Sequence, residues 1–112
     1  MKAQVLERYD EKLTASDWVT LLDVPDPKIV RSTDVIVRIG GAGVCRTDLH
    51  IIEGVWKPHM DPDGHHLLPL IMGHENAGWV EEIGKEVEGL KVGDPVIVHP
   101  KISGGTCLAC RR

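Results

Sequence analysis

The clearest strand signal in the chain is a stretch in which apolar and polar residues alternate. Val35, Val37 and Ile39 occupy every second position of residues 34–39, so their side chains would share one face of a β-strand. Shorter apolar stretches predict further strands. These are expected at residues 2–6, 19–24, 77–83 and 95–99. The glycines that follow residue 39 mark a place where the backbone bends or lets another group approach closely.

One short helix is expected over residues 46–53. Leu49 and Ile52 could cover one side of it, and Gly54 is a typical helix stop signal. The composition of residues 57–69, rich in Pro, Asp, Gly and His, is typical of a loop. Many short strands, glycine turns and one short helix predict a mainly β fold, either a small β-barrel or a partly closed sandwich.

Composition excludes several classes of function. The chain has 112 residues, enough for one domain spanning 1–112. Its net charge of −4 gives no electrostatic footprint for nucleic acid, so we exclude that partner. No apolar run is long enough to cross a membrane, and the charged first ten residues do not form a signal peptide. We therefore expect a cytoplasmic protein, in which thiols stay reduced.

The chain has three cysteines, Cys45, Cys107 and Cys110. An odd number in a reducing compartment argues against a disulfide framework and favours metal binding or chemistry. A thiolate and an imidazole are ligand types that catalytic zinc prefers, and Cys45 and His74 offer this pair 29 residues apart. From spacing alone, such a cysteine is more often a small buried apolar residue, and such a histidine is more often a hydrogen-bonded structural one.

Three sequence strings carry a family resemblance: residues 43–50 (GVCRTDLH), 73–78 (GHENAG) and 89–96 (GLKVGDPV). With these motifs in this order, almost the whole chain resembles the N-terminal catalytic region of zinc-dependent medium-chain alcohol dehydrogenases. The resemblance implies a GroES-like, partly closed β-barrel with one or two short helices. It also implies a Rossmann domain further along the chain, which agrees with the lack of a G-x-G-x-x-G motif here.

The resemblance implies roles for the residues around the cysteine and the histidine. Cys45 and His74 match ligands of a catalytic zinc, and Glu75 matches a carboxylate that exchanges onto the metal. A third ligand would come from sequence beyond Arg112. Asp48 matches an acid that hydrogen-bonds the ligand histidine and fixes its tautomer.

Further roles concern the substrate and the cofactor. Thr47 and His50 match a relay that takes a proton from the alcohol, although Thr47 could also be a helix cap and His50 an exposed helix residue. Arg46 resembles a residue that pairs with the pyrophosphate of NAD or NADP, or it is a surface cation. Trp56 matches a pocket-lining aromatic in some members, or it packs in the core. The implied substrate is a small alcohol or carbonyl compound, and homo-oligomers occur in the family.

The C-terminal cysteine pair departs from the family pattern. Cys107 and Cys110 match two of the four ligands of a structural zinc, but Gly104 stands where the first should be. We therefore expect an incomplete structural site in a chain that stops near this lobe. Alternatively, both are free thiols at the chain end.

Two weaker predictions concern other histidines. The residues His59, Asp61, Asp63, His65 and His66 could bind a metal, but a solvated loop is the favoured interpretation. His99 is a further candidate for the substrate pocket.

Competing functions fit the same strings. A related polyol or amino-alcohol dehydrogenase would share the site, and a non-catalytic GroES-like fragment or interaction module would share only the barrel. Zinc-free quinone oxidoreductases would not need both Cys45 and His74. Without the Rossmann domain, the barrel should expose an apolar patch.

Overall fold

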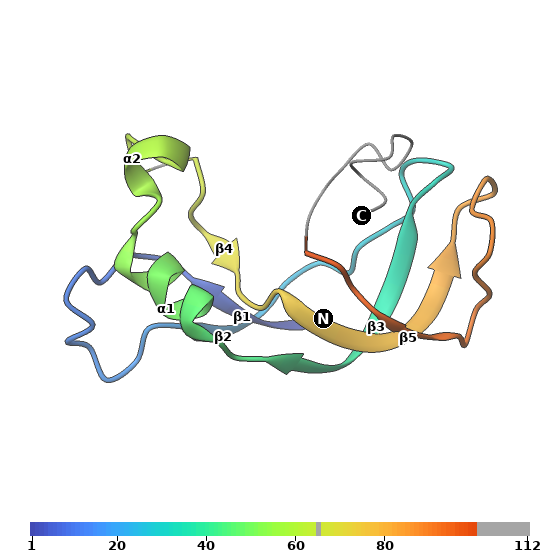
Figure 1. The fold of residues 1–112 in the computed structure, drawn as a ribbon, viewed down its shortest axis with the longest axis horizontal. Coiled ribbons are helices and arrows are strands. Elements are labelled where there is room, and N and C mark those ends of the chain that lie inside the picture. The colour runs from blue at the N-terminus through green and yellow to red at the C-terminus, as the bar shows by residue number, and fades with distance from the viewer. Residues whose placement is uncertain (65, 101–112) are drawn as a thin grey trace.

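The computed structural model describes residues 1–64 and 66–100. In this range the chain forms short strands and two short helices (Figure 1). In chain order they are β1 (Lys2–Leu6), β2 (Thr20–Asp23), β3 (Val35–Gly43), α1 (Arg46–Glu53), α2 (Lys57–Met60), β4 (Leu70–Ile71), β5 (Glu75–Ile83) and β6 (Pro95–Ile97). Gly104, Cys107 and Cys110 lie outside the described residues, so the structural-zinc expectation stays a prediction.

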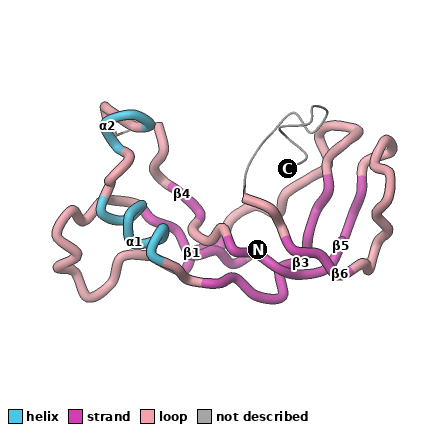
Figure 2. Tube along the Cα trace, viewed as in Figure 1, coloured by secondary structure: helices cyan, strands magenta, loops and turns pink. Residues whose placement is uncertain are grey.

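The described strands form two open antiparallel sheets. One has the order β2-β1-β4 and the other the order β3-β5-β6. Figure 2 shows the helices at the end of the molecule opposite the β3-β5-β6 sheet. The expected mainly β fold with short helices is confirmed, and the open sheets agree with incomplete closure. No helix in the described part of the chain has both the length and the apolar character needed to cross a membrane.

Strand β3 continues through its glycines to Gly43 and is bent along its length (Figure 1). Close approach is the reason for glycine at Gly40, where a Cβ atom would come within 2.5 Å of the Trp79 ring. Two register shifts, the second between Ile39 and Gly41, interrupt the pairing of β3 with β5. Beyond the second shift, pairing resumes and reaches Gly43.

Part of the expected loop 57–69 is a short helix. α2 occupies Lys57–Met60, with a proline in its first turn, where the missing N–H is not needed. The two-residue strand β4 then pairs with β1. The loop prediction was therefore wrong at residues 57–60, because proline favours a helix start as readily as it ends one.

The described residues bury a small core. Only five apolar residues are buried: Ala3, Val5, Leu6, Ile52 and Val80. The radius of gyration is 16.0 Å, whereas a compact chain of this length has about 13 Å. An apolar groove of about 590 Å³ lies on the β3-β5-β6 sheet, and Trp79, Pro95 and Ile97 are among its walls. The expectation of an exposed apolar patch is confirmed.

Candidate metal centre

Strand pairing brings Cys45 and His74 together. The end of β3 pairs with the start of β5, with Gly43 opposite Glu75. Cys45 follows Gly43 by two residues, and His74 immediately precedes Glu75. The antiparallel ladder therefore places these distant residues side by side, and the Cys45 Sγ and His74 Nε2 atoms lie 3.4 Å apart.

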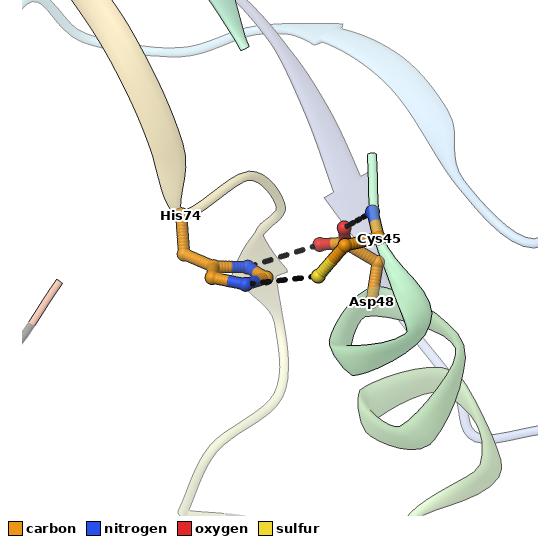
Figure 3. Close-up of side chains that lie close together, drawn as sticks. All are labelled: Cys45, Asp48 and His74. Carbon is orange, nitrogen blue, oxygen red and sulfur yellow. Dashed lines mark hydrogen bonds and ion pairs between the residues drawn. The ribbon is translucent and has the colours of Figure 1, made fainter. Parts of the chain in front are cut away.

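Asp48 completes a group of three side chains at this position (Figure 3). Its Oδ1 atom lies 3.2 Å from His74 Nδ1, and its Oδ2 atom accepts a hydrogen bond of 2.9 Å from the Cys45 backbone N–H. One donor atom from each residue lies within 4.8 Å of the others. Among the described residues, no other group of three His, Cys, Asp or Glu side chains meets this criterion.

The start of α1 fixes the thiol. Cys45 is the N-cap residue of the helix, and its Sγ atom accepts the Thr47 backbone N–H at 3.3 Å. The Asp48 carboxylate in turn accepts a hydrogen bond from the Cys45 N–H, and the two bonds form a capping box. The thiol and the carboxylate are thus held by the helix end itself.

Asp48 also sets the orientation of the histidine. Asp48 is 6% exposed, and its Oδ1 atom faces His74 Nδ1 although the contact lacks hydrogen-bond alignment. Two buried polar atoms this close favour a proton between them, which assigns the proton to Nδ1 and leaves Nε2 free. Because Asp48 Oδ2 binds the Cys45 N–H and Oδ1 faces His74 Nδ1, we assign Asp48 to orienting His74 and leave Sγ and Nε2 as the candidate metal-binding atoms.

The donor set fits zinc. A zinc ion bound tetrahedrally by one sulfur at about 2.3 Å and one nitrogen at about 2.1 Å holds the two ligand atoms about 3.6 Å apart. The separation between Cys45 Sγ and His74 Nε2 is 3.4 Å, close to that distance. Two ligands leave the remaining positions for other groups.

Glu75 lies beside this group but not within it. Its side chain is exposed and lies over Gly43, where an added Cβ atom would collide with the carboxylate. Glycine at position 43 therefore leaves room for the Glu75 side chain over the end of β3.

A second cluster lies along α1. The Arg46 Nε atom donates a hydrogen bond of 3.2 Å to His50 Nε2. Trp56 stacks against His50, with 6.2 Å between ring centroids and 24° between ring planes. Trp56 is 39% exposed, so the alternative prediction that it packs in the core is wrong.

An apolar cleft of about 390 Å³ borders the metal centre. Asp48 and Gly73 form part of its wall, next to the candidate metal-binding atoms. Its other walls are largely apolar and include Trp18, Val19, Leu49, Ile52 and Met72. The structure thus joins a sulfur–nitrogen metal centre to an apolar space.

One residue of the expected solvated loop, Asp61, is buried instead of solvated. Asp61 is 0% exposed and accepts a hydrogen bond of 2.6 Å from the Tyr9 hydroxyl. Sequence could not reveal this pair, because its members are 52 residues apart. His59 and His66 are exposed, as expected for a solvated loop, and so is His99. His65 lies outside the described residues.

Comparison with known proteins identifies relatives. The family model for the alcohol dehydrogenase GroES-like domain matches residues 31–112. The chain is 42% identical over 110 residues to D-arabinose 1-dehydrogenase (NADP(+)) of Saccharolobus solfataricus, covering 98% of this chain and 28% of the relative. It is 39% identical over 111 residues to an NAD-dependent alcohol dehydrogenase of Sulfolobus acidocaldarius, covering 99% of this chain and 30% of the relative.

A solved structure of an alcohol dehydrogenase is also similar to this chain. The alcohol dehydrogenase of the archaeon Aeropyrum pernix matches with a TM-score of 0.79 and 47% identity, over 99% of this chain and 29% of that one. The chain thus spans less than a third of the length of these relatives.

Proposed function

Because the chain belongs to the alcohol dehydrogenase GroES-like domain family, we propose that it is the zinc-holding, alcohol-binding region of an NAD(P)-dependent zinc alcohol dehydrogenase. The observation that carries this proposal is the 3.4 Å approach of Cys45 Sγ to His74 Nε2, with Asp48 behind the imidazole. A co-chaperonin-like barrel or interaction module has no use for this arrangement.

Cys45 and His74 would hold the zinc, and Asp48 would keep the His74 ring in the tautomer that offers Nε2. Glu75 is the exchangeable carboxylate of the proposal, and a further ligand would come from outside the described residues. When bound, zinc supplies Lewis acidity that makes an alcohol hydroxyl easier to deprotonate near neutral pH.

Thr47 and His50 would handle the proton. They are three residues apart on α1, so their side chains lie on the same side of the helix. The Thr47 hydroxyl would accept the hydrogen bond of the alcohol, and the His50 imidazole would pass the proton towards solvent. The guanidinium of Arg46 donates to His50 Nε2, which gives the imidazole a defined orientation.

The cofactor and substrate complete the proposal. Relatives are named for NADP and for NAD, so either nicotinamide would accept the hydride. Arg46 is exposed, and we retain it as a pyrophosphate contact in a complete protein with a Rossmann domain. A sugar or amino-alcohol substrate is the second candidate, since relatives include D-arabinose 1-dehydrogenase and L-threonine 3-dehydrogenases.

Cobalt binding tests the metal centre without needing activity. In a C107S/C110S background, where Cys45 is the only thiol, the chain should bind one Co²⁺ and show a thiolate-to-cobalt absorption band. Cys45→Ser should abolish the band. Asp48→Asn keeps the helix cap but loses the charge behind His74, and should weaken Co²⁺ binding about 10- to 100-fold.

The control for this experiment is His59→Ala, which removes an exposed imidazole of α2 that is not part of the Cys45, Asp48 and His74 group. It should leave the Co²⁺ titration unchanged. A folded chain that binds no cobalt, or whose absorption band survives Cys45→Ser, would contradict the proposed zinc centre.

A further inference from the structure

The segment between α1 and β4 is anchored at a buried carboxylate. Asp61 accepts the Tyr9 hydroxyl at 2.6 Å and the His66 backbone N–H at 2.7 Å, and it is 0% exposed. A buried carboxylate is costly unless hydrogen bonds compensate for the lost water. The Asp61 carboxylate therefore joins Tyr9, which follows β1, to the backbone at His66.

Tyr9 also contacts the segment on the other side of Trp56. Gly54, the C-cap of α1, lies against the Tyr9 ring, where an added Cβ atom would come within 3.2 Å of it. The Lys57 ammonium lies 5.5 Å from the centre of the same ring. Tyr9 thus touches the chain at Gly54, Lys57 and Asp61, and Trp56 lies between these contacts.

Among the described residues, backbone hydrogen bonds also hold this segment, including Val55 N–H to His50 C=O and Lys57 N–H to Gly54 C=O. α2 is a single turn, too short to be stable alone, and none of its side chains is buried. Its backbone bonds join Met60 N–H to Trp56 C=O and Asp61 N–H to Lys57 C=O, each at 2.9 Å. These bonds connect Trp56 to the anchor at Asp61 through one helical turn.

The position of Trp56 matters because it stacks on His50. We propose that Tyr9 and Asp61 are positioning residues, which hold the Trp56 ring against His50. The positioning follows from these contacts alone. Only the statement that the Trp56 ring would face a substrate rests on the proposed function.

The Tyr9 hydroxyl is a persistent donor. Burial, the hydrogen bond to Asp61 and the charge of Asp61 together raise the pKa of Tyr9 from 10.0 to about 12. The hydroxyl therefore keeps its proton, and can still donate to Asp61, at alkaline pH where a free tyrosine ionises.

Fluorine NMR of the chain labelled with 5-fluorotryptophan tests the inference. The chain has three tryptophans, whose resonances can be assigned by single Trp→Phe substitutions. Tyr9→Phe and Asp61→Asn should each move the Trp56 resonance towards its position in His50→Ala, where the stacking partner is gone. The Trp79 resonance, on the distant sheet, should stay in place.

Ser32→Ala is the matched control. It also removes a hydroxyl-to-carboxylate hydrogen bond of 2.6 Å, from Ser32 to Glu86, but on an exposed site away from the segment. It should leave Trp56 unmoved. An unchanged Trp56 resonance in either folded variant would overturn the inference. A shift of the Trp79 resonance together with that of Trp56 would also overturn the inference, because Tyr9 and Asp61 would then support the whole fold rather than this segment.

Cobalt titration of the same variants separates this inference from the proposed function. Tyr9→Phe and Asp61→Asn should bind Co²⁺ within about twofold of the parent chain, because neither residue contacts Cys45 or His74 in the described structure. Absence of cobalt binding in the parent chain would refute the zinc centre and leave the Trp56 result standing.

Discussion

At the residue scale, the side chains that offer chemistry each have a second partner that fixes their orientation. Cys45 offers its thiol while capping α1, and His74 offers Nε2 while its Nδ1 atom faces Asp48. His50 is held between Arg46 and Trp56. Such support matters because a misplaced group loses much of its catalytic effect.

Tyr9 gives a pH-dependent prediction at this scale. Its pKa rises from 10.0 in the unfolded chain to about 12 in the folded one, so the protonated form favours folding. This contribution is complete below pH 10 and is lost as the pH rises towards 12. Urea unfolding at several alkaline pH values should show the stability advantage of wild type over Tyr9→Phe shrinking in that window. A difference that stays constant from pH 9 to 12 would contradict the assigned hydrogen bond.

At the element scale, sequence patterns located the main elements but not their junctions. Alternation at Val35, Val37 and Ile39 identified β3 correctly, and Gly54 marked the end of α1. The need for glycine at position 40 comes from the Trp79 ring of another strand, which no local pattern contains. The Tyr9–Asp61 hydrogen bond could not be predicted from sequence for the same reason.

The candidate metal-binding residues could be named from sequence, because the motifs around Cys45 and His74 are distinctive strings. Their proximity, however, results from the pairing of Gly43 with Glu75, a tertiary feature. The contact of Arg46 with His50 could not be predicted from sequence, since it depends on side-chain geometry along one helix turn.

The end of α1 yields a prediction for the element. Gly54 has φ +73°, in the left-handed region, and its N–H bonds back to the helix. Gly54→Ala should destabilise the chain by about 1–2 kcal/mol, from the left-handed strain of a residue with a Cβ atom. Urea unfolding measures this. Gly41→Ala is the control, because nothing lies within 4 Å of its added Cβ atom, and it should not destabilise.

At the scale of the whole molecule, the exposed apolar groove on the β3-β5-β6 sheet is the dominant feature. Ile97 is 85% exposed at its edge, and Trp79 is 42% exposed within it. Surface of this kind is covered by another protein surface in most stable assemblies. It agrees with a chain that spans less than a third of the length of its relatives.

Dye binding measures this surface. The folded chain should enhance the fluorescence of an apolar dye such as ANS, and Ile97→Lys should reduce the enhancement by placing a charge in the groove. Val30→Lys is the control, since Val30 is 86% exposed but lies outside the groove. Equal losses in both variants, or no enhancement in the parent chain, would show that the groove is not the binding surface.

The ladder between β3 and β5 has a consequence for how such proteins diversify. Since pairing of Gly43 with Glu75 sets the distance between thiol and imidazole, the length of the intervening chain does not. Under the proposed function, insertions or deletions there would remodel the cleft walls while Cys45 Sγ and His74 Nε2 stay fixed. One inherited strand register would then serve many specificities.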